Sequence, residues 1–198
     1  MIIGICGLIG AGKDTAADYL VNFHEFKRES FANTLKDAVA SVFGWDREML
    51  EGRTKHAREW REEIDPWWSE RLEMPNLTPR LILQRWGTEV CRKGFHDDIW
   101  IASLENKLRK SGDDVVISDC RFPNEIKAIR NAGGRVIRIK RGLDPEWFNT
   151  ARLNPTAMSA QWPEIHASEY SWASTEFDFI IENNDSIETL YNQIRNLV

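Results

Sequence analysis

A glycine-rich loop between an apolar run and a helical pattern constrains this 198-residue chain more than any other feature. Residues 2–6 read Ile-Ile-Gly-Ile-Cys and predict a short buried strand, and from Asp14 onward apolar side chains recur at helical spacing. Between them stands Gly7-Leu-Ile-Gly-Ala-Gly-Lys13, which matches the pattern G-x-x-x-x-G-K. Because strand, tight loop and helix follow in that order, the sequence predicts a phosphate-binding loop at the N-terminus of the first helix.

The chemistry of this loop depends on its glycines, its lysine and the residue after the lysine. Glycines allow successive backbone N–H groups to turn toward the phosphate oxygens of a nucleotide, and the ammonium of Lys13 reaches the β and γ phosphates. Asp14 occupies the position where Ser or Thr is usual, and Thr15 follows one place later. We predict that Asp14 approaches the metal shell of the transferred phosphate, with a plain first-turn helix charge as the alternative.

Strands and helices alternate along the rest of the chain. Apolar or alternating runs predict strands near residues 26–31, 115–117, 135–141 and 177–181. Helical spacing and capping residues predict helices over 14–23, 35–43, 79–86, 97–110, 123–132 and 186–197. Strands separated by helices predict an α/β fold in which a five-stranded, mostly parallel sheet is covered on both faces.

Two stretches depart from this alternation. Residues 45–78 are densely charged and contain Pro66-Trp67-Trp68, which predicts helical material added to the core. Residues 142–168 contain three prolines and little periodicity, so they predict a long mobile segment, and loops of that length usually serve a function. We expect both stretches within a single domain that covers residues 1–198.

Composition limits the class of protein. The chain has 26 basic and 31 acidic side chains, and its net charge of −5 argues weakly against a nucleic acid partner. Its apolar runs are far shorter than the roughly 18 residues of a membrane span, and the N-terminus lacks the basic region of a signal peptide. Three widely spaced cysteines favour free thiols in a reducing compartment, and the four histidines show no zinc spacing. We therefore expect a cytoplasmic protein.

A second polar cluster follows the strand at residues 115–117. Asp119 stands at the carboxyl end of this strand, where open α/β sheets bind their ligands. Together with Arg121 and Glu125 it places an acid, a base and another acid within two helical turns, which suits a phosphate and a sugar hydroxyl. Two structural roles compete with binding: Asp119 as the N-cap of the next helix, and Arg121 as a brace paired with Asp119 or Glu125.

The chain resembles the phage deoxynucleoside monophosphate kinases of the type found in T-even phages. The resemblance rests on blocks in a fixed order, and residues 45–76 and 142–164 match it least. The blocks are Gly12-Lys-Asp-Thr15, Leu35-Lys-Asp-Ala38, Leu83-Gln-Arg-Trp-Gly-Thr-Glu89, Trp100-Ile101, Ser118-Asp-Cys-Arg-Phe-Pro-Asn-Glu125, His166-Ala-Ser-Glu169 and Glu182-Asn-Asn-Asp-Ser-Ile-Glu-Thr-Leu190.

This resemblance implies a P-loop, NMP-kinase-like three-layer sandwich that transfers the γ-phosphoryl group of ATP to a deoxynucleoside 5′-monophosphate. Residues 45–78 would cover the substrate, and residues 142–168 would form a lid-like segment. The products, ADP and a deoxynucleoside diphosphate, would serve nucleotide supply for phage DNA synthesis, and the family suggests a homodimer. The residues implied for ATP are Gly10, Ala11, Gly12, Lys13, Asp14 and Thr15, with the Thr15 hydroxyl near Mg²⁺ among phosphates and water.

The resemblance also implies an acceptor pocket. Its residues are Arg53, Arg80, Gly87, Thr88, Trp100, Asp119, Arg121, Glu125 and Ser168. Such a set makes physical sense, because a guanidinium suits the acceptor phosphate, an indole packs on the base or sugar, and carboxylates bind hydroxyls or base edges. From both sets we predict that Lys13, Asp14, Asp119 and Arg121 are catalytic.

Three further arginines, Arg138, Arg141 and Arg152, flank or lie in the lid-like segment, and we predict that one of them closes over ATP. Two other functions stay open: a P-loop kinase of another acceptor, such as a small phosphorylated metabolite or a modified pyrimidine in DNA, and a non-catalytic ATP-binding switch. A switch would bind ATP equally well but needs no acceptor pocket, so Arg80, Asp119 and Arg121 distinguish a switch from a kinase.

Other conspicuous features have plainer interpretations. Trp67 and Trp68 are interpreted as packing residues, although indoles can stack on a base. The charge run over residues 58–63 predicts a solvated helix face. Cys120 is interpreted as a small buried hydrophobe.

Overall fold

The computed structural model describes all residues from 1 to 198, and they form two compact units. We call residues 1–30 and 105–198 the sheet unit and residues 31–104 the helical unit. The stretch expected to be a helical insertion, residues 45–78, lies within the helical unit, whose core also takes in Leu35 and Trp100 from outside that stretch. The organisation as a single domain stays a prediction.

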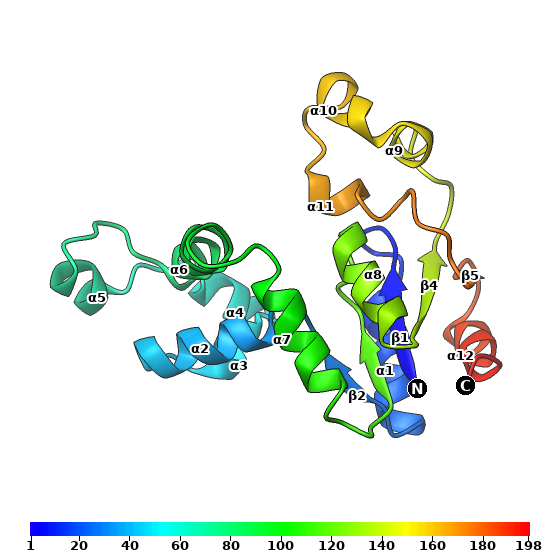
Figure 1. The fold of residues 1–198 in the computed structure, drawn as a ribbon, viewed down its shortest axis with the longest axis horizontal. Coiled ribbons are helices and arrows are strands. Elements are labelled where there is room, and N and C mark those ends of the chain that lie inside the picture. The colour runs from blue at the N-terminus through cyan, green and yellow to red at the C-terminus, as the bar shows by residue number, and fades with distance from the viewer. The chain divides into compact units, whose positions relative to one another are not determined.

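The sheet unit is built on five strands, drawn as arrows in Figure 1. They are β1 (Ile2–Cys6), β2 (Lys27–Glu29), β3 (Val115–Ile117), β4 (Arg135–Lys140) and β5 (Phe179–Glu182). Their order is β2-β3-β1-β4-β5, and all four neighbouring pairs are parallel. The predicted five-stranded sheet is therefore confirmed, and it is wholly parallel. The carboxyl ends of the strands meet at one edge, which is where such sheets bind ligands.

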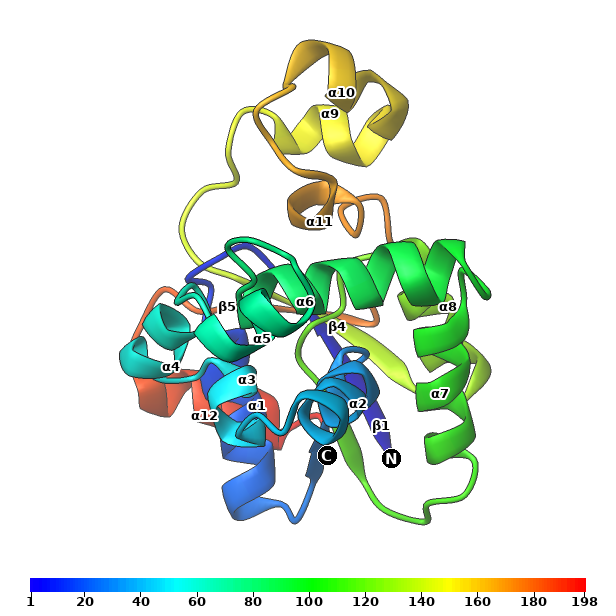
Figure 2. The ribbon, with the colours of Figure 1, turned by 90° about the vertical axis from the view of Figure 1, so that its left-hand side faces the viewer.

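Helices cover both faces of this sheet, as Figure 2 shows. On one face lie α1 (Lys13–Phe23) and α12 (Ile187–Arg195), and on the other lies α8 (Pro123–Asn131). The central strands read as continuous apolar runs because both of their faces are buried, and residues such as Ile5, Val116 and Ile139 are fully enclosed. The predicted three-layer α/β sandwich is confirmed.

Residues 142–176 carry more regular structure than the sequence predicted. They contain α9 (Phe148–Leu153), a 3₁₀ turn η2 (Pro155–Ala157), α10 (Met158–Gln161) and α11 (Ala167–Tyr170). Phe148, Met158 and Trp172 are buried, and the ring centroids of Phe148 and Trp172 lie 5.7 Å apart. These buried residues are too widely spaced in the sequence to produce a helical or strand period. Both views place α11 over the carboxyl edge of the sheet, with α9 and α10 farther out (Figures 1 and 2).

The helical unit consists of short helices around its own core. They are α2 (Asn33–Phe43), α3 (Arg47–Glu51), α4 (Lys55–Trp60), α5 (Pro66–Arg71), α6 (Pro79–Arg85), a π-helix η1 (Trp86–Lys93) and α7 (Ile99–Leu108), the end of which belongs to the sheet unit. The π-helix was not predicted, although such helices are often found at functional sites. None of the helices in the chain combines the length and apolarity needed to cross a membrane.

Candidate functional site

The phosphate-binding loop lies between β1 and α1, as predicted, and its backbone requires glycine. Gly7, Gly10 and Gly12 have φ angles of +148°, +78° and +102°, a region that residues with a side chain rarely adopt. A Cβ atom at Gly7 would also overlap the carbonyl oxygen of Ile139, and one at Gly12 would lie 2.5 Å from Nδ2 of Asn183. The loop is thus a close-fitting backbone turn at a helix N-terminus, which is the geometry of an anion site.

Lys13 is the first residue of α1, and its ammonium folds back over the loop. Its Nζ donates hydrogen bonds of 2.9 Å to the carbonyl oxygens of both Gly7 and Leu8. Burial lowers the pKa of Lys13, and the charges of Asp14, Arg121 and Glu169 also act on it. Two elements far apart in the sequence, the residues after β3 and α11, therefore bring charged groups to Lys13.

Asp14 is held by a residue that the sequence analysis did not single out, Arg28 on β2. The Arg28 guanidinium pairs with the carboxylate of Asp14, donates a 2.7 Å hydrogen bond to Oδ1 of Asp18, and donates another of 2.7 Å to the Ser118 hydroxyl. Its side chain is only 19% exposed. The sequence showed Arg28 only as a basic side chain in a predicted strand. Its role could not be predicted from this pattern, because its partners lie 10 to 90 positions away.

Arg121 lies on the loop after β3, and its guanidinium faces α11. Its Nη1 donates to the Ser168 hydroxyl at 3.4 Å and lies 3.6 Å from Oε1 of Glu169. Half of the Arg121 side chain is exposed, so it is open to an anionic ligand. The fold thus brings together the predicted residues Lys13, Arg121 and Ser168.

Asp119 and Glu125 flank Arg121, and their predicted roles as ligand-binding acids stay predictions. Asp119 does not cap α8, whose N-cap is Phe122, and one of its carboxylate oxygens is buried. The Glu125 carboxylate is buried and accepts hydrogen bonds from the backbone N–H groups of Arg121 at 2.8 Å and Phe122 at 3.1 Å. In this structure Glu125 caps α8 and fixes the backbone of Arg121, because a carboxylate three residues into a helix reaches those N–H groups.

The three arginines proposed for the lid have different environments. Arg138 lies on β4, is 5% exposed and pairs with Asp144, and its Cζ lies 4.2 and 5.4 Å from the ring centroids of Phe148 and Trp172. A guanidinium enclosed in this way anchors residues 144–172 to the sheet and is not available to close over ATP, so we remove it from the lid candidates. Arg141 and Arg152 are exposed and stay candidates.

The remaining predicted acceptor residues belong to the helical unit. Arg53 is exposed, Arg80 lies 3.3 Å from a carboxylate oxygen of Glu62, and Thr88 lies exposed on η1. Trp100 is 8% exposed within the hydrophobic core and donates a 3.0 Å hydrogen bond to the carbonyl oxygen of Gly87. Trp100 thus holds η1 through Gly87, and the expected contact of its indole with a base or sugar stays a prediction.

The aromatic pair at residues 67 and 68 has split roles. Trp68 packs against Phe43 and donates a 3.0 Å hydrogen bond to the carbonyl oxygen of that residue, while Trp67 is 61% exposed.

Cys120 is fully buried, and burial raises its pKa well above the usual range, so it is no nucleophile.

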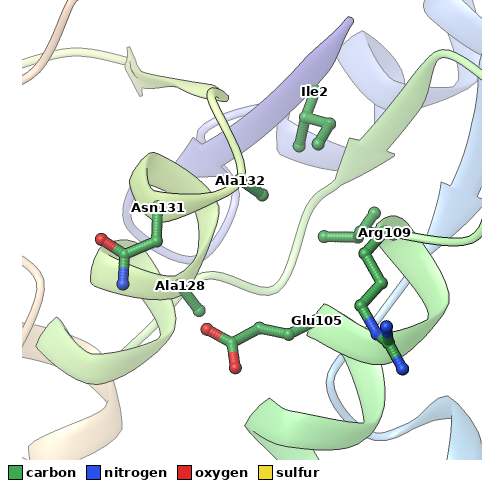
Figure 3. A pocket seen from close by; sticks show the side chains of 7 residues that line it. Ile2, Glu105, Arg109, Ala128, Asn131 and Ala132 are labelled. Carbon is green, nitrogen blue, oxygen red and sulfur yellow. The ribbon is translucent and has the colours of Figure 1, made fainter.

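A pocket of about 320 Å³ lies elsewhere in the sheet unit, as Figure 3 shows. It is lined by Ile2, Glu105, Leu108, Arg109, Ala128, Asn131 and Ala132. Ile2 is the first residue of β1, whereas the phosphate-binding loop follows the last, so this pocket lies at the other end of the strand. None of the predicted site residues lines it.

The loop and its surroundings fit a nucleoside triphosphate. The left-handed glycines, the close approach of Ile139 and Asn183, and the ammonium of Lys13 form a backbone site for phosphate oxygens. The structure contains no group of three or more His, Cys, Asp or Glu side chains that could hold a metal. Magnesium at this site would therefore depend on phosphate oxygens together with hydroxyl or carboxylate groups such as those of Thr15 and Asp14.

Comparison with known proteins identifies relatives of this chain. A family model described as deoxynucleotide monophosphate kinase matches residues 69–194. A provisionally named deoxynucleotide monophosphate kinase of Acanthamoeba polyphaga mimivirus is 32% identical over 98% of this chain and 94% of its own length. The deoxynucleoside-5′-monophosphate kinase of Escherichia phage T5 is 27% identical over 66% of this chain and 72% of its own length. Among solved structures, the shikimate kinase of Aquifex aeolicus has a TM-score of 0.43 and 12% identity, covering 100% of this chain and 95% of that one.

Proposed function

This chain belongs to the deoxynucleotide monophosphate kinase family, and from that premise we propose that it transfers the γ-phosphoryl group of ATP to a deoxynucleoside 5′-monophosphate. The observation that carries the proposal is that the phosphate-binding loop with Lys13 follows β1 and the loop with Arg121 follows β3, its parallel neighbour, so both loops lie at the carboxyl edge of the sheet unit. We assign Lys13 to the triphosphate and Arg121 to the acceptor nucleotide. A protein that binds ATP only as a switch would not need a group for an acceptor.

In the proposed reaction an oxygen of the acceptor phosphate attacks the γ-phosphorus, and the bond between that phosphorus and the oxygen that bridges it to the β-phosphorus breaks. ADP leaves and a deoxynucleoside diphosphate forms, with no covalent enzyme intermediate, because the acceptor phosphate is already a nucleophile. The protein aligns the two nucleotides and compensates the negative charge on the transferred group. Magnesium, when bound, neutralises part of that charge.

The residues of the sheet unit divide this work. The backbone of residues 10–13 binds the donor phosphates, and Lys13 exchanges its bonds to loop carbonyls for bonds to phosphate oxygens. We assign the Thr15 hydroxyl to the metal and the Asp14 carboxylate to the shell of ligands around it. The ion pair with Arg28 fixes the position of this carboxylate. Arg121 is assigned to the acceptor phosphate, since its guanidinium is half-exposed and can form a bidentate pair with a phosphate.

A panel of nucleoside monophosphates tests this function. The protein, ATP and Mg²⁺ are combined with each ribo- and deoxyribonucleoside monophosphate in turn, and ADP release and diphosphate formation are measured. We expect turnover with at least one deoxynucleoside monophosphate and only slow ADP release without acceptor. Phosphorylation of a non-nucleotide metabolite or of DNA would establish a different acceptor, and ATP binding without any transfer would establish a switch.

The proposed setting is nucleotide supply for viral DNA synthesis. The relatives named above are proteins of a giant virus and of a bacteriophage. Cys6, Cys91 and Cys120 are free thiols, which suits the reducing cytoplasm of a host cell.

A further inference from the structure

Asn183, the residue after β5, reaches the phosphate-binding loop from the far end of the sequence. Its Nδ2 donates a 2.8 Å hydrogen bond to the carbonyl oxygen of Ala11, 172 positions away. The amide packs so closely on the loop that a Cβ atom at Gly12 would lie 2.5 Å from Nδ2. All three residues belong to the sheet unit. Asn183 is absent from the site residues that the sequence predicts, so the contact identifies a new candidate.

The bond from Asn183 differs from the other side-chain bonds to this loop. Lys13 donates hydrogen bonds of 2.9 Å to the carbonyl oxygens of Gly7 and Leu8. In the proposed reaction Lys13 leaves these carbonyls for phosphate oxygens, and its support of the loop is lost. The neutral amide of Asn183 has no such second task. Its bond to Ala11 can therefore persist while a nucleotide is bound.

This bond sets the direction of one N–H group of the loop. The carbonyl of Ala11 and the N–H of Gly12 belong to the same peptide unit, and across a trans peptide bond these two groups point in opposite directions. Asn183 holds the carbonyl on one side, so the N–H of Gly12 points to the other. That N–H donates to no acceptor within the protein. A fixed and unused N–H in such a loop is a donor for a phosphate oxygen.

Asn183 is itself held in place by the sheet. Its backbone N–H donates a 2.7 Å hydrogen bond to the carbonyl oxygen of Lys140, which continues the parallel pairing of β4 with β5 beyond the register pair of Lys140 and Glu182. Its side chain is partly buried. Because the backbone of Asn183 is fixed, its amide supports the loop before any nucleotide arrives. A support that is already in place lowers the cost of ordering the loop on binding.

We propose that Asn183 is a positioning residue for the donor nucleotide. Its amide holds the peptide unit between Ala11 and Gly12 so that the N–H of Gly12 is aimed at the phosphates of ATP. The proposal rests on the proposed function for the identity of the nucleotide. Asn183 acts through the loop backbone and not on the reacting atoms, so its loss weakens the binding of ATP and leaves the binding of the acceptor unchanged.

The test compares Asn183→Ala and Asn183→Asp with the matched control Gln193→Met. Gln193, on α12, makes the same kind of bond, from its Nε2 to the carbonyl oxygen of Glu182 at 3.1 Å, but this carbonyl lies outside the loop. For each variant the KM of ATP, the KM of the acceptor, kcat and the melting temperature are measured.

We expect Asn183→Ala to raise the ATP KM by about 5- to 50-fold, because a backbone hydrogen bond to a charged phosphate loses its alignment. The acceptor KM and kcat should stay within about threefold of wild type, since a contact made both before and during transfer affects KM rather than kcat. Asn183→Asp should raise the ATP KM at least as much, because a carboxylate of the same size cannot donate to a carbonyl. Gln193→Met should leave all these values within about twofold, as a substitution away from the site.

The two variants separate a hydrogen-bond donor from a side chain that only fills space. If Asn183→Ala raises the ATP KM and Asn183→Asp does not, the side chain only packs, and the proposal is wrong. If Asn183→Asp alone raises it, the added charge is responsible, and the proposal is again wrong. An equal rise in both KM values, with a melting temperature well below that of Gln193→Met, would show that Asn183 merely braces the fold.

Calorimetric titration with ADP, without an acceptor, separates this inference from the proposed function. We expect Asn183→Ala to weaken the binding of ADP by a factor similar to the rise in the ATP KM. If the wild type binds ADP more tightly than Asn183→Ala but phosphorylates no nucleoside monophosphate, the function is overturned and the positioning role stands. If the wild type phosphorylates a monophosphate and Asn183→Ala binds ADP as tightly as the wild type, the positioning role is overturned and the function stands.

Discussion

Lys13 is the residue on which donor chemistry most depends. Its ammonium already faces the loop carbonyls at 2.9 Å, so it needs only to change partners when phosphates bind. We predict that Lys13→Ala lowers kcat by at least about 100-fold, because charge that grows during transfer loses a preorganised counterion. The melting temperature should change little, since the lost hydrogen bonds are partly exposed. Steady-state kinetics and thermal unfolding check this, and near-wild-type turnover would contradict the assignment of the loop.

The effect of replacing Arg121 distinguishes a kinase with an acceptor site from an ATP-binding switch. If its guanidinium binds the acceptor phosphate, Arg121→Ala removes a contact of about 1.5 to 3 kcal/mol and raises the acceptor KM roughly 10- to 150-fold, with the ATP KM nearly unchanged. Arg130→Ala is the control, because Arg130 lies on α8 and pairs with Asp178. An acceptor KM within twofold of wild type for Arg121→Ala would mean that Arg121 serves only to hold Ser168 and Glu169.

We predict that Arg28 acts on the reaction through Asp14, and its ion pair with Asp18 provides a control. We predict that Arg28→Ala and Asp14→Asn each raise the Mg²⁺ concentration needed for half-maximal activity, because the carboxylate is displaced in one and neutralised in the other. Their effects should not add in the double variant, since both remove the same pair. Asp18→Asn removes only the neighbouring ion pair and should leave the Mg²⁺ titration unchanged. Equal effects of Asp18→Asn and Arg28→Ala would reduce Arg28 to a brace for α1.

At the scale of elements, one carboxylate joins α2 to α3. Burial by itself would raise the pKa of Glu51, but the hydrogen bonds from Arg47 at 2.7 Å and Lys36 at 2.9 Å outweigh it and lower that pKa to about 2. A carboxyl with a lowered pKa stabilises the folded state above its ordinary pKa, and this contribution is lost as pH falls from about 4.5 toward 2.

We therefore predict that Glu51→Gln destabilises the protein at pH 7 by about 1 to 2 kcal/mol, a figure reduced for solvent screening of partly exposed partners. The difference from wild type should shrink as pH is lowered through the same range. Glu48→Gln, on the same helix but exposed, is the control. Melting temperatures measured from about pH 7 down to about pH 2.5 provide the measurement, because the contribution is constant near neutral pH and is lost only below about 4.5. A constant difference across that range would contradict the coupling.

At the scale of the whole molecule, charge bears on the choice of acceptor. Binding to DNA is driven by counterions that are released when basic side chains neutralise the phosphates. A protein with a net charge of −5 repels the phosphates and gains little from this release. We predict that a DNA duplex neither competes with the monophosphate acceptor nor accepts phosphate from ATP, even at low salt, where electrostatic binding is strongest. Competition assays over a range of salt concentrations check this, and inhibition that weakens steeply with salt would point to a nucleic acid substrate.

The sequence by itself determined the parts of this protein that depend on near neighbours. Residues 2–23 fold as strand, loop and helix because the apolar run, the left-handed glycines and the helical period all act within a few positions of one another. The same reason holds for β3 and for α8, which begins at the predicted Pro123. Ordered motifs then sufficed to indicate the kinase family.

Only the tertiary structure decided which distant groups meet and what each polar side chain does. Arg28 reaches Ser118 across 90 positions, and Arg121 turns to Ser168 across 47, because parallel strands carry separate segments to one edge of the sheet. Other roles depend on burial in the folded protein. Trp100 belongs to the hydrophobic core of the helical unit, Arg138 is buried and pairs with Asp144, and the guanidinium of Arg61 lies against Gly52. A sequence pattern gives the period of exposure along one element, whereas the partner of a charged side chain depends on the arrangement of several.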